Sequence, residues 1–229
     1  SGLGGGVVPD AFMILSRIIA SFHNDKGELL IEGLTPTEQD VFELSDEFVK
    51  SSLSSTGVNL FEMDSYSKRL WLEPALSILA IDAPPVAESV NLLIPKAKAK
   101  VSLRLPPTED PDHAMNMLEQ HIKENTPFNA NVEFIPEAKG KGILVDPKNE
   151  FSSKLIESFN KHWENEVAYM GVGGSIPFAN VFINEFPNSE IVLVGAGDEE
   201  GNAHAPNESV NISDIQRLID SLTDAISNY

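Results

Sequence analysis

The chain has 229 residues, carries a formal net charge of −19 at pH 7 and contains no cysteine. Its length allows one large domain or two small ones. The lack of cysteine excludes a disulfide framework and any cysteine-based nucleophile or metal site, and fits a cytoplasmic protein. The acidic balance argues against nucleic acid and anionic membrane surfaces as partners. The apolar runs have strand length, so no transmembrane helix is predicted.

The first part of the chain predicts a helix, a turn, a short strand and a second helix. Asp10 can cap the first helix, and its apolar face is spaced at helical intervals: Leu15, Ile18, Ile19 and Phe22. A turn at 24–27 precedes a possible strand over 28–35, and a second helix is predicted over 37–50.

The clearest strand runs from Lys96 to Leu105. Alternate residues are apolar on one side, and the other side carries Lys96, Lys98, Lys100, Ser102 and Arg104. Further strands are predicted over 71–81 and 131–136. Between them, Asp110 with Pro111 begins a helix whose buried stripe includes His121. Helices covering one face of these strands predict a two-layer sandwich with an open, polar outer face.

Gly140–Gly142 predicts a boundary between residues 1–140 and 141–229. The second segment predicts a helix over 149–163, a glycine-rich turn over 171–177, a strand over 190–194 and a final helix. Ser213 and Gln216 can form a capping box for that helix, whose inward face is predicted to be Ile215, Leu218, Ile219, Leu222 and Ile226. This second segment is therefore predicted to be α/β.

His204 lies in the polar heptapeptide Asn202–Glu208, between the predicted strand and the final helix. A histidine fixed from both sides suits a metal ligand, because binding needs a neutral imidazole in one orientation. A surface histidine is the alternative. The other histidines lack ligand spacing and are interpreted as structural or surface residues: His23, His113, His121 and His162. A catalytic zinc site needs three protein ligands, so His204 alone does not define one.

Two features can bind a carboxylate. Gly174 and Ser175 lie in a loop whose exposed amides and hydroxyl can receive an oxyanion, with a plain tight turn as the alternative. Arg104 on the open strand face can clamp a carboxylate by two parallel hydrogen bonds, with a solvent-facing arginine as the alternative.

The GxG start at Gly195 is not followed by a helix, which disfavours a dinucleotide site. The acidic run 198–200 is interpreted as a solvated loop tip.

Several motifs occur in a fixed order: Ser1-Gly2-x-x-Gly5-Gly6, Ile94-Pro95, Ser102–Pro107, Gly173–Pro177 and Asn202–Glu208. Together they resemble the co-catalytic zinc peptidases of metallopeptidase family 20, which include aminoacylases, desuccinylases and carnosinase-like dipeptidases. The resemblance implies a catalytic domain with two zinc ions and an inserted lid domain that mediates homodimerisation. Residues 1–140 then correspond to the lid, with its first strand missing, and residues 141–229 to the closing segment of the catalytic domain.

The resemblance also implies roles for individual residues. His204 matches the last metal ligand, Arg104 matches the lid arginine that binds the substrate carboxylate, and Gly174 with Ser175 match the loop that receives the same end. The substrate would be a dipeptide or N-acyl amino acid with a free carboxylate. The family's other ligands and its glutamate base precede the lid, so no catalytic residue is assigned. The chain alone is expected to be inactive and to bind zinc weakly or not at all.

Two alternatives remain open from the sequence. One is a free-standing interaction module that uses the lid-like sheet for dimerisation without catalysis. The other is an α/β nucleotide-binding protein, based on the GxG start at Gly195.

Overall fold

The computed structural model describes residues 2–53, 57–144, 146–172, 177–186, 188–198, 201–203 and 205–229. The chain divides into two compact units. Unit 1 comprises Ser1–Gly142 and Met170–Ser175, and unit 2 comprises Ile143–Tyr169 and Ile176–Tyr229. Whether these units are a lid and a catalytic segment, divided near residue 140, remains a prediction.

The elements in chain order are α1 (Ala11–Ala20), α2 (Asp46–Leu53), α3 (Tyr66–Trp71), β1 (Ala75–Asp82), η1 (Val86–Glu88), β2 (Lys98–Arg104), α4 (Pro111–Glu124), η2 (Pro127–Asn129), α5 (Glu150–His162), α6 (Pro177–Glu185) and α7 (Ile212–Ser227). The described residues contain one sheet, in which β1 and β2 pair antiparallel. None of the described helices is long and apolar enough to cross a membrane.

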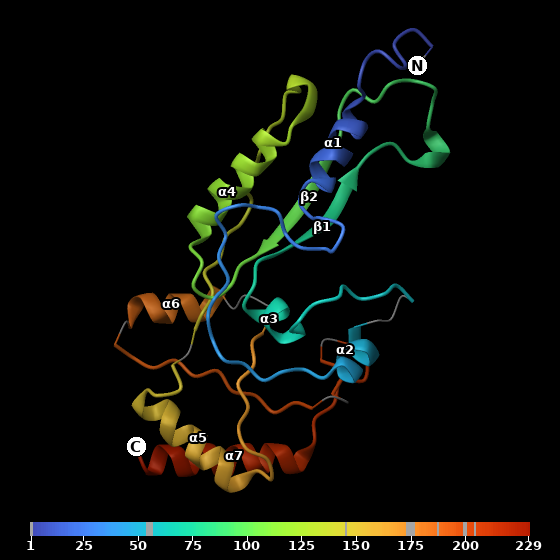
Figure 1. Ribbon diagram of the computed structural model, residues 1–229. Helices are drawn as coiled ribbons and strands as arrows, with labels where there is room; N and C mark the ends of the chain where they lie inside the picture. The colour runs from blue at the N-terminus through green and yellow to red at the C-terminus, as the bar shows by residue number, and fades with distance from the viewer. Residues whose placement is uncertain are drawn as a thin grey trace. The chain divides into compact units, whose positions relative to one another are not determined.

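Unit 1 has its core between this two-stranded sheet and helices α1 and α4, which lie along the strands in Figure 1. The buried core residues come from both layers and from the chain after α1: Ile18, Phe22, Ile31, Leu76 and Leu118. The ring of His121 stacks on Phe22 at 5.5 Å and its Nε2 lies 3.1 Å from Ser21 Oγ. The predicted mixed fold, with helices on one face of a sheet, is confirmed in this unit, and the sheet is antiparallel.

The two core helices begin where the sequence predicts. The side chain of Asp10 accepts a hydrogen bond from the Met13 amide at 2.9 Å. That of Asp110 accepts from the amides of Asp112 and His113, both at 2.9 Å, with Pro111 in the first helical position. Each cap satisfies amides that have no partner within the helix.

Other predicted elements are wrong. No strand forms over 28–35, 131–136 or 190–194; Leu29 makes only an isolated bridge to His23. The helix predicted over 37–50 is present only as α2, and the strand predicted from residue 71 begins at 75. Ser65 caps the unpredicted helix α3 by accepting from the Lys68 amide at 3.1 Å, so Trp71 is helical. Helix α6 was not predicted either.

In unit 2, α5 packs against α7 through small side chains. Ser221 and Ala225 of α7 are buried, and the Ser158 hydroxyl on α5 donates to the Ser221 carbonyl at 2.7 Å. The predicted inward face of α7 is therefore wrong for Ile215, Ile219 and Ile226, whose exposed fractions are 37%, 50% and 65%. The predicted capping box is also wrong: Asn211 caps α7 by accepting from the Ser213 amide at 3.0 Å.

Candidate functional site

Arg104 is the one predicted site residue that lies within the described residues. It ends β2, opposite Ala75 of β1, and its side chain is exposed on the outer face of the sheet. The predicted alternation along this strand is confirmed, because Lys98, Lys100 and Ser102 are also exposed while the residues between them are partly buried. The sheet therefore presents the Arg104 guanidinium away from the core.

Arg104 differs from the other arginines of the chain in its contacts. The Arg17 guanidinium lies 5.7 Å from the Phe128 ring centre. Arg69 pairs with Glu73 at 2.8 Å, and Arg217 pairs with Asp214 at 3.2 Å. Among the residues that the structure describes, the Arg104 side chain has no hydrogen-bond or ion-pair partner. None of the described residues therefore occupies its five N–H donors, which can bind a ligand.

The turn that follows Arg104 is held by a partly buried polar network that the sequence did not predict, in which Thr37 and Glu109 are the buried members. The hydroxyls of Thr37 and Thr108 lie 2.7 Å apart, and the Thr108 amide donates to the same Thr37 oxygen at 3.3 Å. Glu109, which is buried, has its Oε1 2.7 Å from His113 Nδ1 and accepts from the Thr35 amide through Oε2 at 3.4 Å. The Thr37–Thr108 and Thr35–Glu109 contacts span more than 70 residues of sequence, so no local sequence pattern predicts them.

The remaining predicted site residues, Gly174, Ser175 and His204, lie outside the described residues. The structure does describe residues next to them in the chain. Gly171 lies directly against Trp71. The Ala205 amide donates to the Asn202 carbonyl at 2.9 Å, and Asn202 has a positive φ of 51°. Asparagine tolerates this left-handed conformation, which fits the predicted turn at this end of the heptapeptide.

The histidines interpreted as structural or surface residues differ in their surroundings, and the Nε2 of His162 is buried without a hydrogen-bond partner among the described residues, 3.6 Å from Asp224. Burial, and to a smaller extent the charge of Arg69, lowers the pKa of His23. His113 contacts buried Glu109, and His121 belongs to the core of unit 1. Within the described ranges, no three histidine or acidic side chains gather where they could hold a metal ion. The described residues therefore do not form a zinc site by themselves.

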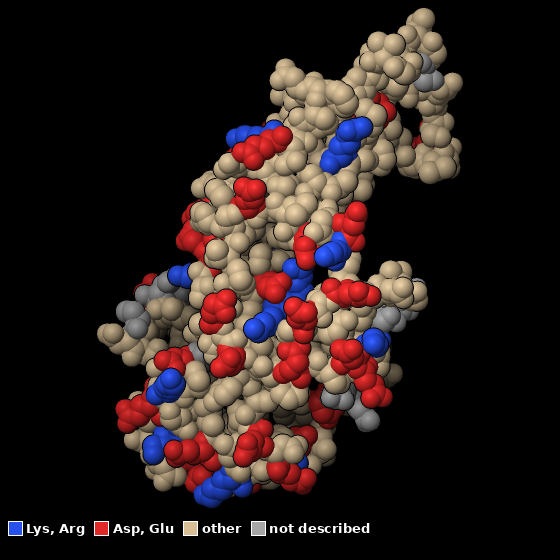
Figure 2. Space-filling model, viewed as in Figure 1, with Lys and Arg blue, Asp and Glu red and all other residues tan. Residues whose placement is uncertain are grey.

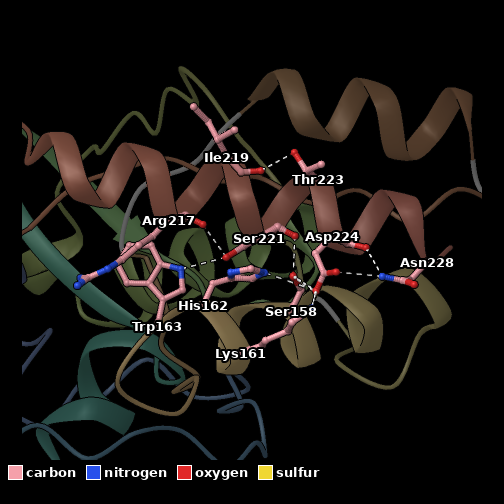
Figure 3. Close-up of polar contacts among 10 residues, drawn as sticks. All are labelled: Ser158, Lys161, His162, Trp163, Arg217, Ile219, Ser221, Thr223, Asp224 and Asn228. Atoms are coloured by element: carbon pink, nitrogen blue, oxygen red, sulfur yellow. Dashed lines mark hydrogen bonds and ion pairs between the residues drawn. The ribbon is translucent and has the colours of Figure 1, made fainter.

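A polar cluster in unit 2 joins α5 to α7 (Figure 3). Asp224 accepts hydrogen bonds from Lys161 Nζ at 2.9 Å and from Ser158 Oγ at 3.3 Å. The bond from Lys161 lowers the pKa of Asp224, and the nearby His162 ring acts in the same direction. Trp163 donates from its indole nitrogen to Ser221 Oγ at 3.2 Å. These contacts hold two helices together, so we interpret the cluster as structural.

Acidic side chains are spread over the face of the molecule shown in Figure 2, with lysines and arginines between them. Several basic residues pair locally, such as Lys100 with Glu137 at 2.5 Å and Lys123 with Glu119 at 2.5 Å.

Solved structures of similar fold include peptidases. The chain superposes on a di-peptidase from Saccharomyces cerevisiae with a TM-score of 0.74 at 22% identity, covering 99% of this chain and 50% of that chain. It superposes on a human carnosine dipeptidase with a TM-score of 0.73 at 19% identity, covering 100% and 52% respectively. At such identities the similarity establishes the fold alone.

Sequence comparison identifies the family. Residues 1–130 match the peptidase dimerisation domain of metallopeptidase family 20. The chain belongs to this family, which confirms the resemblance found in its motifs. A cysteinylglycine-S-conjugate dipeptidase of Corynebacterium striatum is 29% identical over 228 residues, which are 95% of this chain and 49% of the relative. A Cys-Gly metallodipeptidase of Saccharomyces cerevisiae is 26% identical, over 94% and 47%. The chain spans about half the length of the curated relatives it matches.

Proposed function

We propose that the chain supplies the lid and the closing catalytic segment of a zinc-dependent peptidase that hydrolyses a dipeptide or N-acyl amino acid with a free carboxylate. Residues 1–140 form the lid and residues 141–229 the closing segment. The family match and the dipeptidase names of the relatives support this assignment. A relative named as a metallodipeptidase supports metal dependence, with His204 as the ligand that this chain would provide.

The observation that carries the proposal is the position of Arg104. Its guanidinium is exposed at the end of a strand and has no partner among the described residues. A planar guanidinium binds both oxygens of a carboxylate through two parallel N–H donors, which fixes orientation as well as attraction. The free carboxylate of a dipeptide meets this requirement, whereas its amide does not.

Binding of glycylglycine and of glycylglycine amide to the purified chain, measured by calorimetry, tests the proposal. We expect the chain to prefer glycylglycine, and Arg104→Ala to weaken its binding at least about tenfold, as expected for loss of a charged hydrogen-bonded pair. Lys98→Ala is the matched control, because it removes an exposed cation from the same face of the same strand. Equal affinity for the two probes would refute carboxylate binding by Arg104.

Dimerisation without catalysis is the second candidate function. The matching family is a dimerisation domain, and β1 exposes two large apolar side chains, Leu79 and Ile81. We therefore propose a homodimer through unit 1 in either case. Light scattering measures the oligomeric state, and a dimer that shows no preference for glycylglycine over its amide would favour the interaction module.

A further inference from the structure

Gly171 and Trp71 are in close contact within unit 1. A Cβ atom built on Gly171 would lie 2.4 Å from Cβ and 2.5 Å from Cγ of Trp71. Such distances leave no room for any side chain at position 171. The rigid base of the indole thus determines where the backbone of segment 170–172 lies. This segment leads directly into the residues predicted to receive the substrate carboxylate.

Trp71 is itself fixed at the end of α3. The helix is held at its middle by Arg69, which donates to the Gly27 carbonyl at 2.6 Å. At its end, the amide of the buried residue Leu72 donates a hydrogen bond to the Lys68 carbonyl at 2.8 Å. The carbonyl of Leu72 accepts from the amide of Thr37, also at 2.8 Å. The position of Trp71 therefore depends on Thr37, which binds the end of α3.

Thr37 makes a second contact in a different direction. Its side-chain oxygen lies 2.7 Å from that of Thr108 and accepts from the Thr108 amide. Thr108 belongs to the turn after β2, in which Pro106 is buried and accepts from the Glu109 amide at 3.1 Å. Arg104 ends the strand that leads into this turn. Thr37 is 5% exposed and Thr108 is exposed, so the bonds between them are shielded from water on the Thr37 side.

We propose that Thr37 is a positioning residue for carboxylate binding, because it bridges the turn behind Arg104 to the helix that places segment 170–172. The inference rests on the proposed function. Bidentate binding tolerates only small errors of placement, roughly 0.5 Å and 10–20°. A residue that fixes two binding elements relative to each other therefore controls affinity for the carboxylate without touching it.

The test compares three substitutions in the whole chain. Thr37→Val removes the hydroxyl but keeps the side-chain shape and the amide bond to Leu72. Thr37→Ser retains the hydroxyl and is the rescue variant. Thr35→Val makes the same change at a nearby exposed threonine whose side chain is not part of the bridge. Circular dichroism verifies that each variant folds, and Thr108→Val breaks the same hydroxyl pair from the other side.

The first measurement is hydrogen–deuterium exchange. We expect Thr37→Val and Thr108→Val to speed exchange in both 105–109 and 170–172, whereas Thr37→Ser and Thr35→Val leave both segments unchanged. Fluorescence of Trp71 in a Trp163→Phe background reports the same contact, since these are the two tryptophans of the chain. Faster exchange in only one segment, or in neither, would overturn the bridge.

The second measurement is binding of glycylglycine and its amide. Thr37→Val is expected to weaken glycylglycine binding about three- to tenfold, the range of one lost hydrogen bond, with no change for the amide. If the unsubstituted chain binds both probes equally, the proposed function is wrong and the positioning role falls with it. If the unsubstituted chain prefers glycylglycine and Thr37→Val keeps that affinity, only the positioning role is overturned.

Discussion

One carboxylate oxygen of Glu190 accepts hydrogen bonds from both the amide and the hydroxyl of Ser152, each at 2.9 Å. The other oxygen accepts from the Phe151 amide at 3.0 Å. Asn149, at the capping position of α5, makes no such bond with its side chain. Helix α5 is thus capped by a residue 38 positions away from Ser152, which ties the chain before His204 to the start of the helix.

Replacing Glu190 by glutamine should destabilise unit 2 and make its stability less dependent on acid. Desolvation would raise the pKa of Glu190, but the three hydrogen bonds from Phe151 and Ser152 together lower it below the usual 4.5. Because the folded carboxyl binds protons less readily than the unfolded one, its contribution is complete above that value and is lost as the pH falls through the folded pKa.

Thermal unfolding of both proteins between pH 3 and 7 measures this effect. We expect the midpoint of Glu190→Gln to lie a few degrees lower at pH 7 and the difference to shrink toward pH 3. A constant difference across this range would show that the cap does not depend on ionisation. Glu185→Gln, in which the acidic residue ends α6, is a suitable control for a general charge effect.

Gly142→Ala should destabilise unit 1. An added Cβ would lie 2.6 Å from the Cα of Pro107, which is backbone and cannot rotate away. Overpacking of this kind costs about 1–3 kcal/mol. Gly197→Ala is the matched control, since no atom of the described residues lies within 4 Å of its added Cβ. Urea unfolding of both variants gives the comparison, and equal midpoints would contradict the close contact.

Leu118→Ala tests the core between the sheet and the helices. Leu118 is 4% exposed and belongs to the buried cluster of unit 1, so its truncation should cost about 2–5 kcal/mol. Leu3→Ala removes the same atoms from a fully exposed residue and should change the free energy of unfolding by less than about 0.5 kcal/mol. Similar losses for the two variants would place Leu118 outside the core.

Lys161→Met should raise the pKa of Asp224 toward its ordinary value of 3.8, because the hydrogen bond from Lys161 is the largest cause of its lowering. A carbon-detected NMR titration of the Asp224 carboxyl measures the change. Lys154→Met removes a lysine from the same helix that pairs with Glu157 at 3.9 Å, and should leave the pKa of Asp224 unchanged. An unaltered pKa in Lys161→Met would show that this ion pair does not form in solution.

The parts of the fold that the sequence predicts well depend on neighbouring residues. Asp10 and Asp110 predict the starts of α1 and α4 because a capping residue and its helix are adjacent in the chain. The alternation in β2 placed Arg104 on the open face correctly, because one strand defines its own two sides. Whether Arg104 has a partner cannot be seen in this way, since partners come from anywhere in the chain.

The failures depend on distant residues. The apolar pattern of 131–136 is real, because Phe134 packs against the core, but a strand also needs a neighbour with which to form a ladder. In α7, the isoleucine stripe predicted the wrong inward face because Ser221 and Ala225 allow close approach to α5. The Ser213 hydroxyl donates to Asn211 at 2.7 Å instead of capping the helix.

The close contact between Gly142 and Pro107 bears on how the protein can be divided. Gly142 is the last residue of the long segment of unit 1, and Pro107 begins the turn three residues after Arg104. A protease cut, a truncation or a fused reporter at this joint would therefore disturb the backbone that supports the arginine. A joint placed in the exposed stretch around Lys148 leaves that support intact and is the safer place for dissection.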